Sequence, residues 1–207
     1  MTSTPPVWTT QTPTALLDAL RDTANQPAWS QVEFRYRRVI AALARRLGAS
    51  ESDAEDVAQQ TLTEFVLAYK QGRYDRNKGR LSSWILGIAQ RATLQALRRT
   101  GRAAERPAAG ETLLAEVAGE PELRTIWTDE RDREILSRAM SMLRDEAAID
   151  DRTLLAFELV ALRNVPAAEV ATQAKMSVEQ VYVAKSRVTK RLRQLVGELT
   201  EAFEQDI

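Results

Sequence analysis

The sequence contains neither cysteine nor histidine, and these two absences exclude much familiar enzyme chemistry. Disulfides, Cys/His zinc sites, cysteine nucleophiles and serine–histidine relays all require one of these residues. No apolar run approaches the roughly 18 to 20 residues that cross a bilayer, and the start, MTSTPPVWTT, lacks the basic and apolar regions of a signal peptide. No phosphate-binding glycine loop occurs either. We therefore expect a cytoplasmic protein that is not an enzyme.

What is present is typical of a globular protein with one large or two small domains: 207 residues, 44% of them hydrophobic and 28% charged. Apolar residues recur at three- and four-residue steps, whereas alternation with a period of two is missing. The sequence thus predicts an all-α protein. Because composition shifts to Gly, Ala, Pro and Glu after residue 100, we predict a mobile arm over 1–13, a helical domain over 14–100, a flexible linker over 101–122 and a second helical domain over 123–207.

Local signals also predict where helices in the first domain begin and end. Glycine commonly follows the last residue of a helix, and serine or aspartate commonly caps the first turn. The predicted boundaries are Gly48 after a helix over 28–47, Ser52 or Asp53 at the start and Gly72 at the end of the next helix, and Ser82 or Ser83 at the start of a third.

Charge is sorted along the chain although 29 basic and 29 acidic residues give a net charge of zero. Residues 50–68 include five acidic residues and no basic one, whereas residues 70–106 include ten basic residues against Asp75 and Glu105. Residues 175–193 form a second basic block. This sorting indicates several surfaces that face different partners, with nucleic acid as the expected partner of the basic ones.

Residues 166–196 have the pattern of a helix-turn-helix. Pro166 fits the first turn of a short helix, Lys175, Met176 and Ser177 fit a tight turn, and Ser177 also fits the N-cap of a second helix over 178–196. A basic second helix can place its first residues against base edges in the major groove and its later residues against phosphates. An amphipathic packing helix with a solvated basic face is the alternative.

Six segments together resemble the extracytoplasmic-function type of RNA polymerase sigma factor, group IV of the sigma-70 family. Each motif alone is modest, but their order, their spacing and the intervening linker are specific. The segment DAEDVAQQTL at 53–62 resembles region 2.2. Regions 2.3 and 2.4 are resembled by GRLSSWILGIA at 79–89 and LRR at 97–99. Region 4 is resembled by VPAAEVA at 165–171, SVEQV at 177–181 and KRLRQL at 190–195.

The resemblance implies that region 2 docks on the clamp helices of the polymerase β′ subunit. A charged and amide-bearing helix face suits a partner that presents arginines. Without the resemblance, the same residues would be an ordinary solvated face with capping acids or, less plausibly in the absence of histidine, a metal site. The matching residues are Asp53, Asp56, Gln59, Gln60 and Thr63.

The resemblance also implies that the loop at 72–80 and the helix after it read the promoter −10 element as a single strand, with one base in a pocket. Trp84 could stack on a base, although its place on the apolar stripe with Ile85 and Ile88 favours a core position. The predicted DNA-binding residues of this region are Asn77, Lys78, Arg80, Trp84, Arg91, Gln95, Arg98 and Arg99.

Region 4, by the same resemblance, reads the −35 element and contacts the polymerase β flap. Lys175 departs from the family, which commonly has glycine in this turn, and YVAK at 182–185 replaces a start rich in Lys, Ser and Arg. The base contacts therefore rest on helix geometry alone. The predicted residues are Ser177, Glu179, Gln180, Tyr182, Ser186, Arg187 and Lys190.

The resemblance implies a promoter-specificity subunit that brings core RNA polymerase to promoter DNA, has no cofactor or small-molecule substrate, and is controlled by an anti-sigma factor or another regulator. Zero net charge suits a protein that engages promoters strongly only together with polymerase. The main alternative is a one-component helix-turn-helix regulator that binds an operator as a dimer without polymerase. A protein-interaction adaptor that binds no DNA is a further alternative.

Overall fold

The computed structural model describes residues 13–22, 24–100, 120–146 and 149–204, and every regular element within these ranges is helical. The predicted all-α class is therefore confirmed. The chain divides into two compact units, one of residues 1–134 with 202–207 and one of residues 135–201. The N-terminal arm and most of the predicted linker lie outside the described residues, and helix α6 begins at Glu120.

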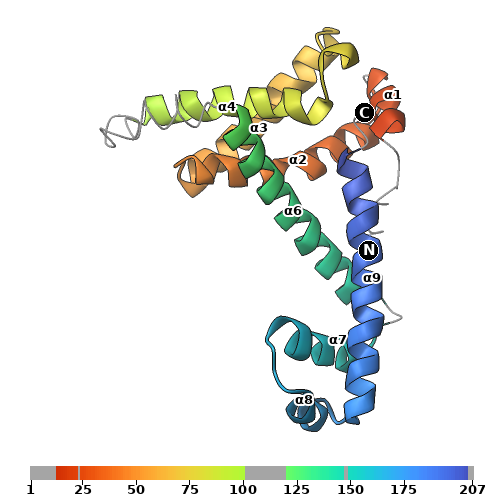
Figure 1. Ribbon diagram of the computed structural model, residues 1–207. Coiled ribbons are helices and arrows are strands. Elements are labelled where there is room, and N and C mark those ends of the chain that lie inside the picture. Colours follow the sequence, from red (N-terminus) through yellow and green to blue (C-terminus); the bar gives the residue numbers. More distant parts are fainter. Residues whose placement is uncertain (1–12, 23, 101–119, 147–148, 205–207) are drawn as a thin grey trace, which may run out of the picture. The chain divides into compact units, whose positions relative to one another are not determined.

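The first unit is built around three long helices that cross one another (Figure 1). Helix α3 packs on both α2 and α4, and the short α1 packs on α2. The apolar stripe expected over residues 28–47 is buried, including Tyr36 and Ile40. The elements are α1 (Pro13–Arg21), α2 (Gln26–Arg46), α3 (Glu51–Lys70), the 3-10 turn η1 (Arg76–Lys78), α4 (Leu81–Arg99) and the first part of α6 (Glu120–Asp145).

An aromatic cluster joins these three helices. The ring of Phe65 on α3 is completely buried, and its centroid lies 6.2 Å from that of Trp29 on α2 and 5.6 Å from that of Trp84 on α4. Tyr69 adds an edge contact to Trp29 at 5.8 Å. Aromatic pairs in such tilted arrangements contribute about 0.5–1.5 kcal/mol each beyond the burial of their area. The cluster therefore fixes the faces that α3 and α4 turn inward.

The helix ends of this unit agree with the sequence in part. Gly48 follows α2 with a φ of 103°, as expected of a glycine stop. The N-cap of α3 is Ser50, so the prediction of Ser52 or Asp53 was wrong. Ser50 has an extended backbone, and its hydroxyl accepts a hydrogen bond from the backbone N–H of Asp53 at 3.2 Å. Only the last residue before the helical backbone can make this bond.

The start of α4 also differs from the prediction. The helix begins at Leu81, with Arg80 at the N-cap and no hydrogen bond from that side chain to the first turn. Ser82 and Ser83 therefore lie inside the first turn instead of starting the helix. Leu81 is completely buried, so the burial of this side chain, and not a side-chain cap, positions the start of α4.

The second unit contains the predicted helix-turn-helix, formed by α8 and the start of α9. Its core is a cluster of small and branched side chains from α7, η2, α8 and α9, with Val170, Val181 and Ala184 at its centre. The elements are the rest of α6, α7 (Asp151–Phe157), the π-helical turn η2 (Glu158–Leu162), α8 (Ala167–Ala174) and α9 (Val178–Glu204).

Three boundaries in this unit differ from the sequence prediction. The helix expected over 151–162 changes to a π-turn at Glu158, whose carbonyl accepts from the N–H of Arg163 at 3.1 Å. Pro166 is the N-cap of α8 and not part of its first turn. Helix α9 continues past residue 196, because Leu199 is buried and extends its apolar face.

Two sets of contacts close the turn between α8 and α9. Lys175 adopts the left-handed conformation with a φ of 52°, and Arg152 of α7 donates hydrogen bonds to the carbonyls of Ala174, at 3.1 Å, and of Lys175. The Ser177 hydroxyl accepts from the N–H of Gln180 at 3.2 Å, and the Gln180 amide oxygen accepts from the N–H of Ser177 at 2.8 Å. This reciprocal capping box confirms Ser177 as the N-cap of α9.

The conformation of Lys175 leads to a stability prediction. Left-handed backbone costs a residue with a Cβ atom roughly 1–2 kcal/mol, and glycine avoids this cost while gaining backbone entropy in the unfolded state. We expect Lys175→Gly to stabilise the protein by about 0.5–1 kcal/mol in urea unfolding. Lys175→Ala serves as the control, because it removes the same charge but keeps the Cβ atom. Equal stability of the two variants would contradict the backbone explanation.

Candidate nucleic-acid and protein-binding surfaces

The predicted polymerase-binding residues of α3 form one exposed face, with one exception. Asp56, Gln59, Gln60 and Thr63 are exposed and line an open groove together with Arg99 at the end of α4. Asp53 is half-buried, and its carboxylate accepts a 2.5 Å hydrogen bond from the Ser50 hydroxyl. The structure thus places Asp53 in the helix cap and brings the other four together. We refer to residues 56, 59, 60 and 63 as the α3 face.

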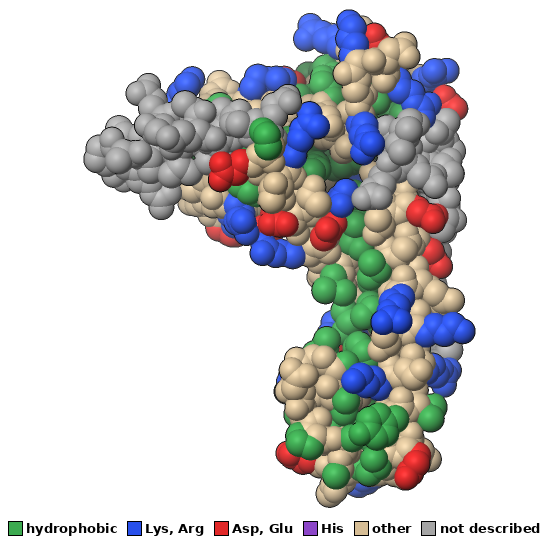
Figure 2. Space-filling view, in the orientation of Figure 1, with side chains coloured by type: hydrophobic (Ala, Val, Ile, Leu, Met, Phe, Trp, Pro, Cys, Tyr) green, Lys and Arg blue, Asp and Glu red, His purple; other side chains and the backbone are tan. Residues whose placement is uncertain are grey.

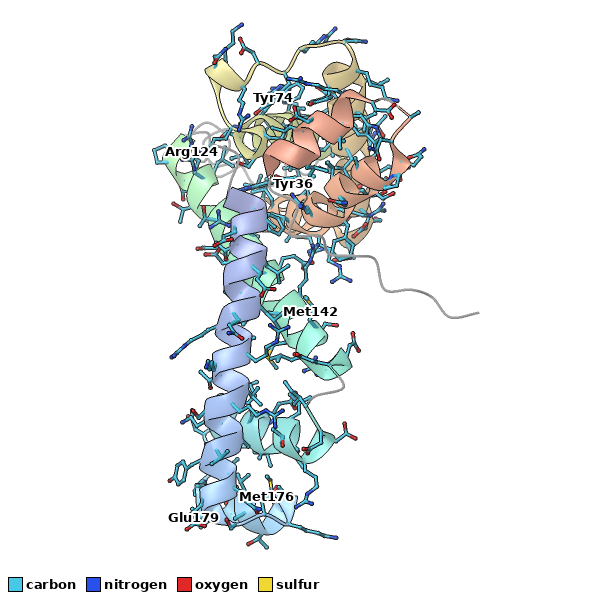
Figure 3. The ribbon with its side chains drawn as sticks, turned by 90° about the vertical axis from the view of Figure 1, so that its right-hand side faces the viewer. Tyr36, Tyr74, Arg124, Met142, Met176 and Glu179 are labelled. Carbon is cyan, nitrogen blue, oxygen red and sulfur yellow. The ribbon has the colours of Figure 1, made fainter. Side chains whose placement is uncertain are left out.

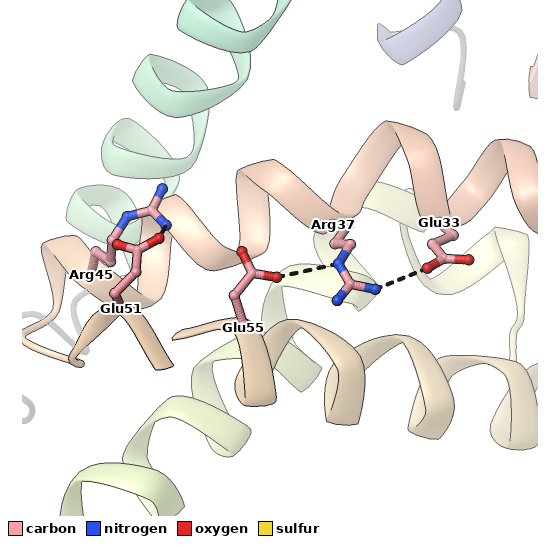
Figure 4. Close-up of polar contacts among 5 residues, drawn as sticks. All are labelled: Glu33, Arg37, Arg45, Glu51 and Glu55. Atoms are coloured by element: carbon pink, nitrogen blue, oxygen red, sulfur yellow. Dashed lines mark hydrogen bonds and ion pairs between the residues drawn. The ribbon is translucent and has the colours of Figure 1, made fainter. Parts of the chain in front are cut away.

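Other acidic residues of the same helix pair with α2 instead of extending this face (Figure 4). Arg37 lies 3.0 Å from Glu33 and 3.3 Å from Glu55, and the Glu33 hydrogen bond raises the pKa of Arg37 above its usual value. Arg45 pairs with Glu51 at 2.9 Å. With Glu64, which lies 3.4 Å from Arg91 of α4, three of the five acids of segment 50–68 therefore form ion pairs within the first unit.

Leu67 adjoins the α3 face but was missed in the sequence. It is 56% exposed and lines both the groove beside Arg99 and a second groove with Trp29 and Val66. Its position four residues after Thr63 places it on the same side of the helix. This spacing was the available signal, although a leucine in an amphipathic helix is ordinarily assigned to the core. The α3 face and Leu67 together therefore combine charge, amides and one apolar side chain.

Two contacts between α3 and α4 bring the predicted polymerase and DNA surfaces side by side. The Gln60 amide donates to the Gln95 amide oxygen at 3.2 Å, and Arg91 lies 3.4 Å from Glu64. Arg98 is exposed near the end of α4. A partner protein on the α3 face would therefore touch the edge of the α4 surface.

The loop after α3 and the start of α4 form a pocket of about 370 Å³, within the usual size range of ligand pockets. Tyr74 and Trp84 stack at 5.2 Å with an interplanar angle of 23° and line it. Trp84 is half-buried and also contacts Phe65, so it has both the core position that the sequence favoured and a place in the pocket wall. Lys78 and Arg80 supply positive charge at the rim.

Several pocket residues were not among the predicted DNA-binding residues, and Tyr74 and Arg124 are two of them. Tyr74 carries no motif of its own, and Arg124 lies on α6, fifty residues further along the chain than the loop. Figure 3 labels both residues. The predicted Asn77 is exposed in the η1 turn, where its backbone N–H donates to Asp75 at 2.9 Å, and it does not line the pocket.

In the second unit, the outward face of α9 is as predicted, apart from two residues that cap the helix. Glu179, Tyr182, Ser186 and Lys190 are exposed at helical spacing, as is Arg187. Ser177 and Gln180 form the capping box described above. Hydrogen bonds from its own backbone N–H and from the Ser177 hydroxyl lower the pKa of Glu179, so this carboxylate stays ionised and can only accept hydrogen bonds.

The views of the second unit show where this face begins. Figure 3 labels Met176 and Glu179 at the end of α9 that meets α8, and Figure 2 shows hydrophobic side chains exposed there, with Lys and Arg further along the helix. Tyr182 is 57% exposed in this region. The arrangement presents polar and apolar groups first and cations later, which is the order expected of a recognition helix.

Comparison with known protein families finds a match for part of the first unit. Residues 35–103 match the family described as sigma-70 region 2. This segment runs from α2 through α4 and contains the α3 face, the loop and most of the pocket. This segment of the first unit is therefore similar to sigma-70 region 2. No solved structure matches the chain.

Comparison with individual proteins finds a more specific similarity. The chain is 31% identical over 91 residues to the ECF RNA polymerase sigma factor SigE of Mycolicibacterium smegmatis. The match covers 44% of this chain and 34% of that relative, so the chain spans about a third of the relative's length. Both findings agree with the resemblance to sigma-70 family proteins of the extracytoplasmic-function type that the motifs predicted. Among the described helices, none has the length and apolar character needed to span a membrane.

Tyr69, whose ring stacks on that of the pocket residue Tyr74, gives a prediction about pH. The Tyr69 hydroxyl donates to the Leu17 carbonyl at 2.8 Å, and burial raises the pKa of Tyr69 above its usual value of 10.0. The folded state therefore keeps this proton to higher pH than the unfolded state. Stability linked to the proton is fully present below pH 10 and is lost as pH rises through the raised pKa.

Tyr69→Phe keeps the ring but removes the hydroxyl. We expect the wild type to exceed this variant by about 1 kcal/mol in free energy of unfolding at pH 8. The difference should shrink as pH rises above 10, which urea unfolding over a pH series can measure. A difference that stays constant across the series would show that Tyr69 does not titrate in this way.

Proposed function

We propose that this protein is a promoter-specificity subunit of bacterial RNA polymerase, which recruits the core enzyme to −35 and −10 promoter elements and helps initiate transcription. The observation that carries the proposal is the coincidence of the region 2 match with two adjoining surfaces of different chemistry, the α3 face and the basic, aromatic-lined pocket. The protein performs no chemistry itself and needs no cofactor. Its location in the cytoplasm stays a prediction.

The α3 face is the proposed docking surface for the β′ clamp helices. Its amides and the Asp56 carboxylate can accept hydrogen bonds from arginines, and Leu67 adds apolar area at one end. Glu51 and Glu55 form ion pairs with arginines of α2, so less of the acidic charge of α3 is available to a partner. Leu67, which is 56% exposed, continues this stripe and gives a partner apolar area beside the polar groups.

The loop pocket and α4 are the proposed surface for the melted −10 strand. A base taken out of its stack needs an aromatic and polar pocket, which Tyr74 and Trp84 line. The strand backbone needs cations nearby, and Arg80, Arg98 and Arg99 are exposed on this side of the chain. Arg91 and Gln95 are linked to α3 and so position the edge of the surface.

The second unit is the proposed reader of the −35 element as duplex DNA and the proposed contact for the β flap. The closed turn between α8 and α9 fixes the entry angle of α9, and the exposed Lys190 is the proposed phosphate contact behind the first turns. An anti-sigma factor or another regulator is the proposed controlling partner.

The polymerase surface can be tested by co-elution with core RNA polymerase free of other sigma factors. We expect the wild type to co-elute and an Asp56→Ala/Gln59→Ala/Gln60→Ala variant to lose co-elution, because the three exposed side chains supply the polar contacts. Leu67→Ala should weaken binding by about tenfold through lost apolar contact.

The matched control is Asp18→Ala/Arg21→Ala, which removes an exposed ion pair on α1 of the same unit. It should unfold and co-elute like the wild type, since exposed pairs contribute little. Failure of the folded wild type to co-elute, combined with dimeric binding to duplex operators, would favour the one-component regulator. Binding of proteins but no DNA in any state would favour the adaptor.

The DNA surface gives a prediction about salt. Each phosphate contact to single-stranded DNA contributes about 0.7 to the slope of log binding constant against log salt concentration. We expect Arg98→Gln, measured in the complex with polymerase on promoter DNA, to lower this slope by about 0.7. Arg21→Gln on α1 is the control and should leave the slope unchanged. A wild-type slope in Arg98→Gln would remove Arg98 from the DNA surface.

A further inference from the structure

The start of α9 exposes an apolar side chain that the predicted base contacts leave out. Val183 is 65% exposed, which is the largest fraction among the large hydrophobic side chains of the described residues. A branched apolar side chain with so much water contact contributes little to the core of its own unit. Because single exposed apolar side chains are ordinary on protein surfaces, its significance depends on where it lies.

Val183 lies on the outward face of α9, which we propose faces the bases. It stands four residues after Glu179 and three before Ser186, so the three side chains share one face of α9. Val181 and Ala184 point the opposite way and are buried in the unit's core. Because the capping box and Arg152 close the turn before α9, the position of Val183 relative to α8 is fixed.

The side-chain chemistry of Val183 indicates which group of a base pair it can contact. Valine neither donates nor accepts hydrogen bonds, whereas its neighbours Glu179 and Ser186 do. Among the groups that base pairs present in the major groove, the thymine C5-methyl is the apolar one. We propose that Val183 reads a thymine methyl group in the −35 element. This inference rests on the proposed function, and it adds a base preference that the family resemblance does not supply.

The experiment uses the complex of the full chain with core polymerase and a library of promoter duplexes with a randomised −35 hexamer. The sequence that binds best is then synthesised again with uracil in place of each −35 thymine in turn, which removes only the methyl group. We expect selection of thymine at one position or more, and one uracil replacement that weakens binding about fourfold, the value of one buried methyl-sized group.

Variants of Val183 locate the reader of that methyl group. Val183→Ser should bind the thymine duplex as weakly as the wild type binds the uracil duplex and should no longer distinguish the two. Val183→Ile keeps apolar area and should retain the preference. Leu136→Ser, which changes another half-exposed apolar residue of the same unit, is the control and should behave like the wild type.

The outcomes separate this inference from the proposed function. A thymine preference that persists in Val183→Ser, or a selected −35 sequence without thymine, would overturn the role of Val183 while leaving the promoter-specificity function intact. Wild-type complexes that bind no sequence of the library would contradict the function itself. Dimerisation of the free chain that Val183→Ser abolishes would instead assign the exposed valine to a contact between copies, and would also overturn the inference.

Discussion

The burial of Phe65 is the constraint on which the first unit depends. Its ring lies between Trp29 of α2 and Trp84 of α4, so α3 cannot rotate about its axis without exposing a large aromatic side chain at a cost of several kcal/mol. With Phe65 inward, positions 56, 60, 63 and 67 must face solvent. The surface that we propose for polymerase binding is therefore a geometric consequence of the core beneath it.

Internal ion pairs explain how a chain of zero net charge can present surfaces of different character. Glu51 and Glu55 form exposed ion pairs with arginines of α2, while Asp56 lies on the α3 face. Opposing surfaces of this kind limit the attraction of the free protein to DNA at long range. A polymerase that covers the α3 face would leave the basic surface of α4 to the promoter.

The features that depend on neighbouring residues could be predicted from the sequence, and those that depend on distant contacts could not. Helical spacing predicted the all-α fold and the outward face of α9, and Ser177 predicted its cap. By contrast, Arg124 lines the same pocket as Tyr74 only through tertiary packing. The exposure of Leu67 likewise depends on what α2 and α4 leave uncovered, and the choice of Ser50 over Ser52 as a cap depends on which backbone is extended.

The most direct test of the central claim is transcription in a purified system. Core RNA polymerase and this protein are incubated, separately and together, with a library of promoter templates, and the transcripts are sequenced. The account predicts that specific start sites arise only when both are present and that the templates used share −35 and −10 sequences. Equal transcription by core polymerase with and without the protein, at a protein concentration that saturates binding, would contradict it.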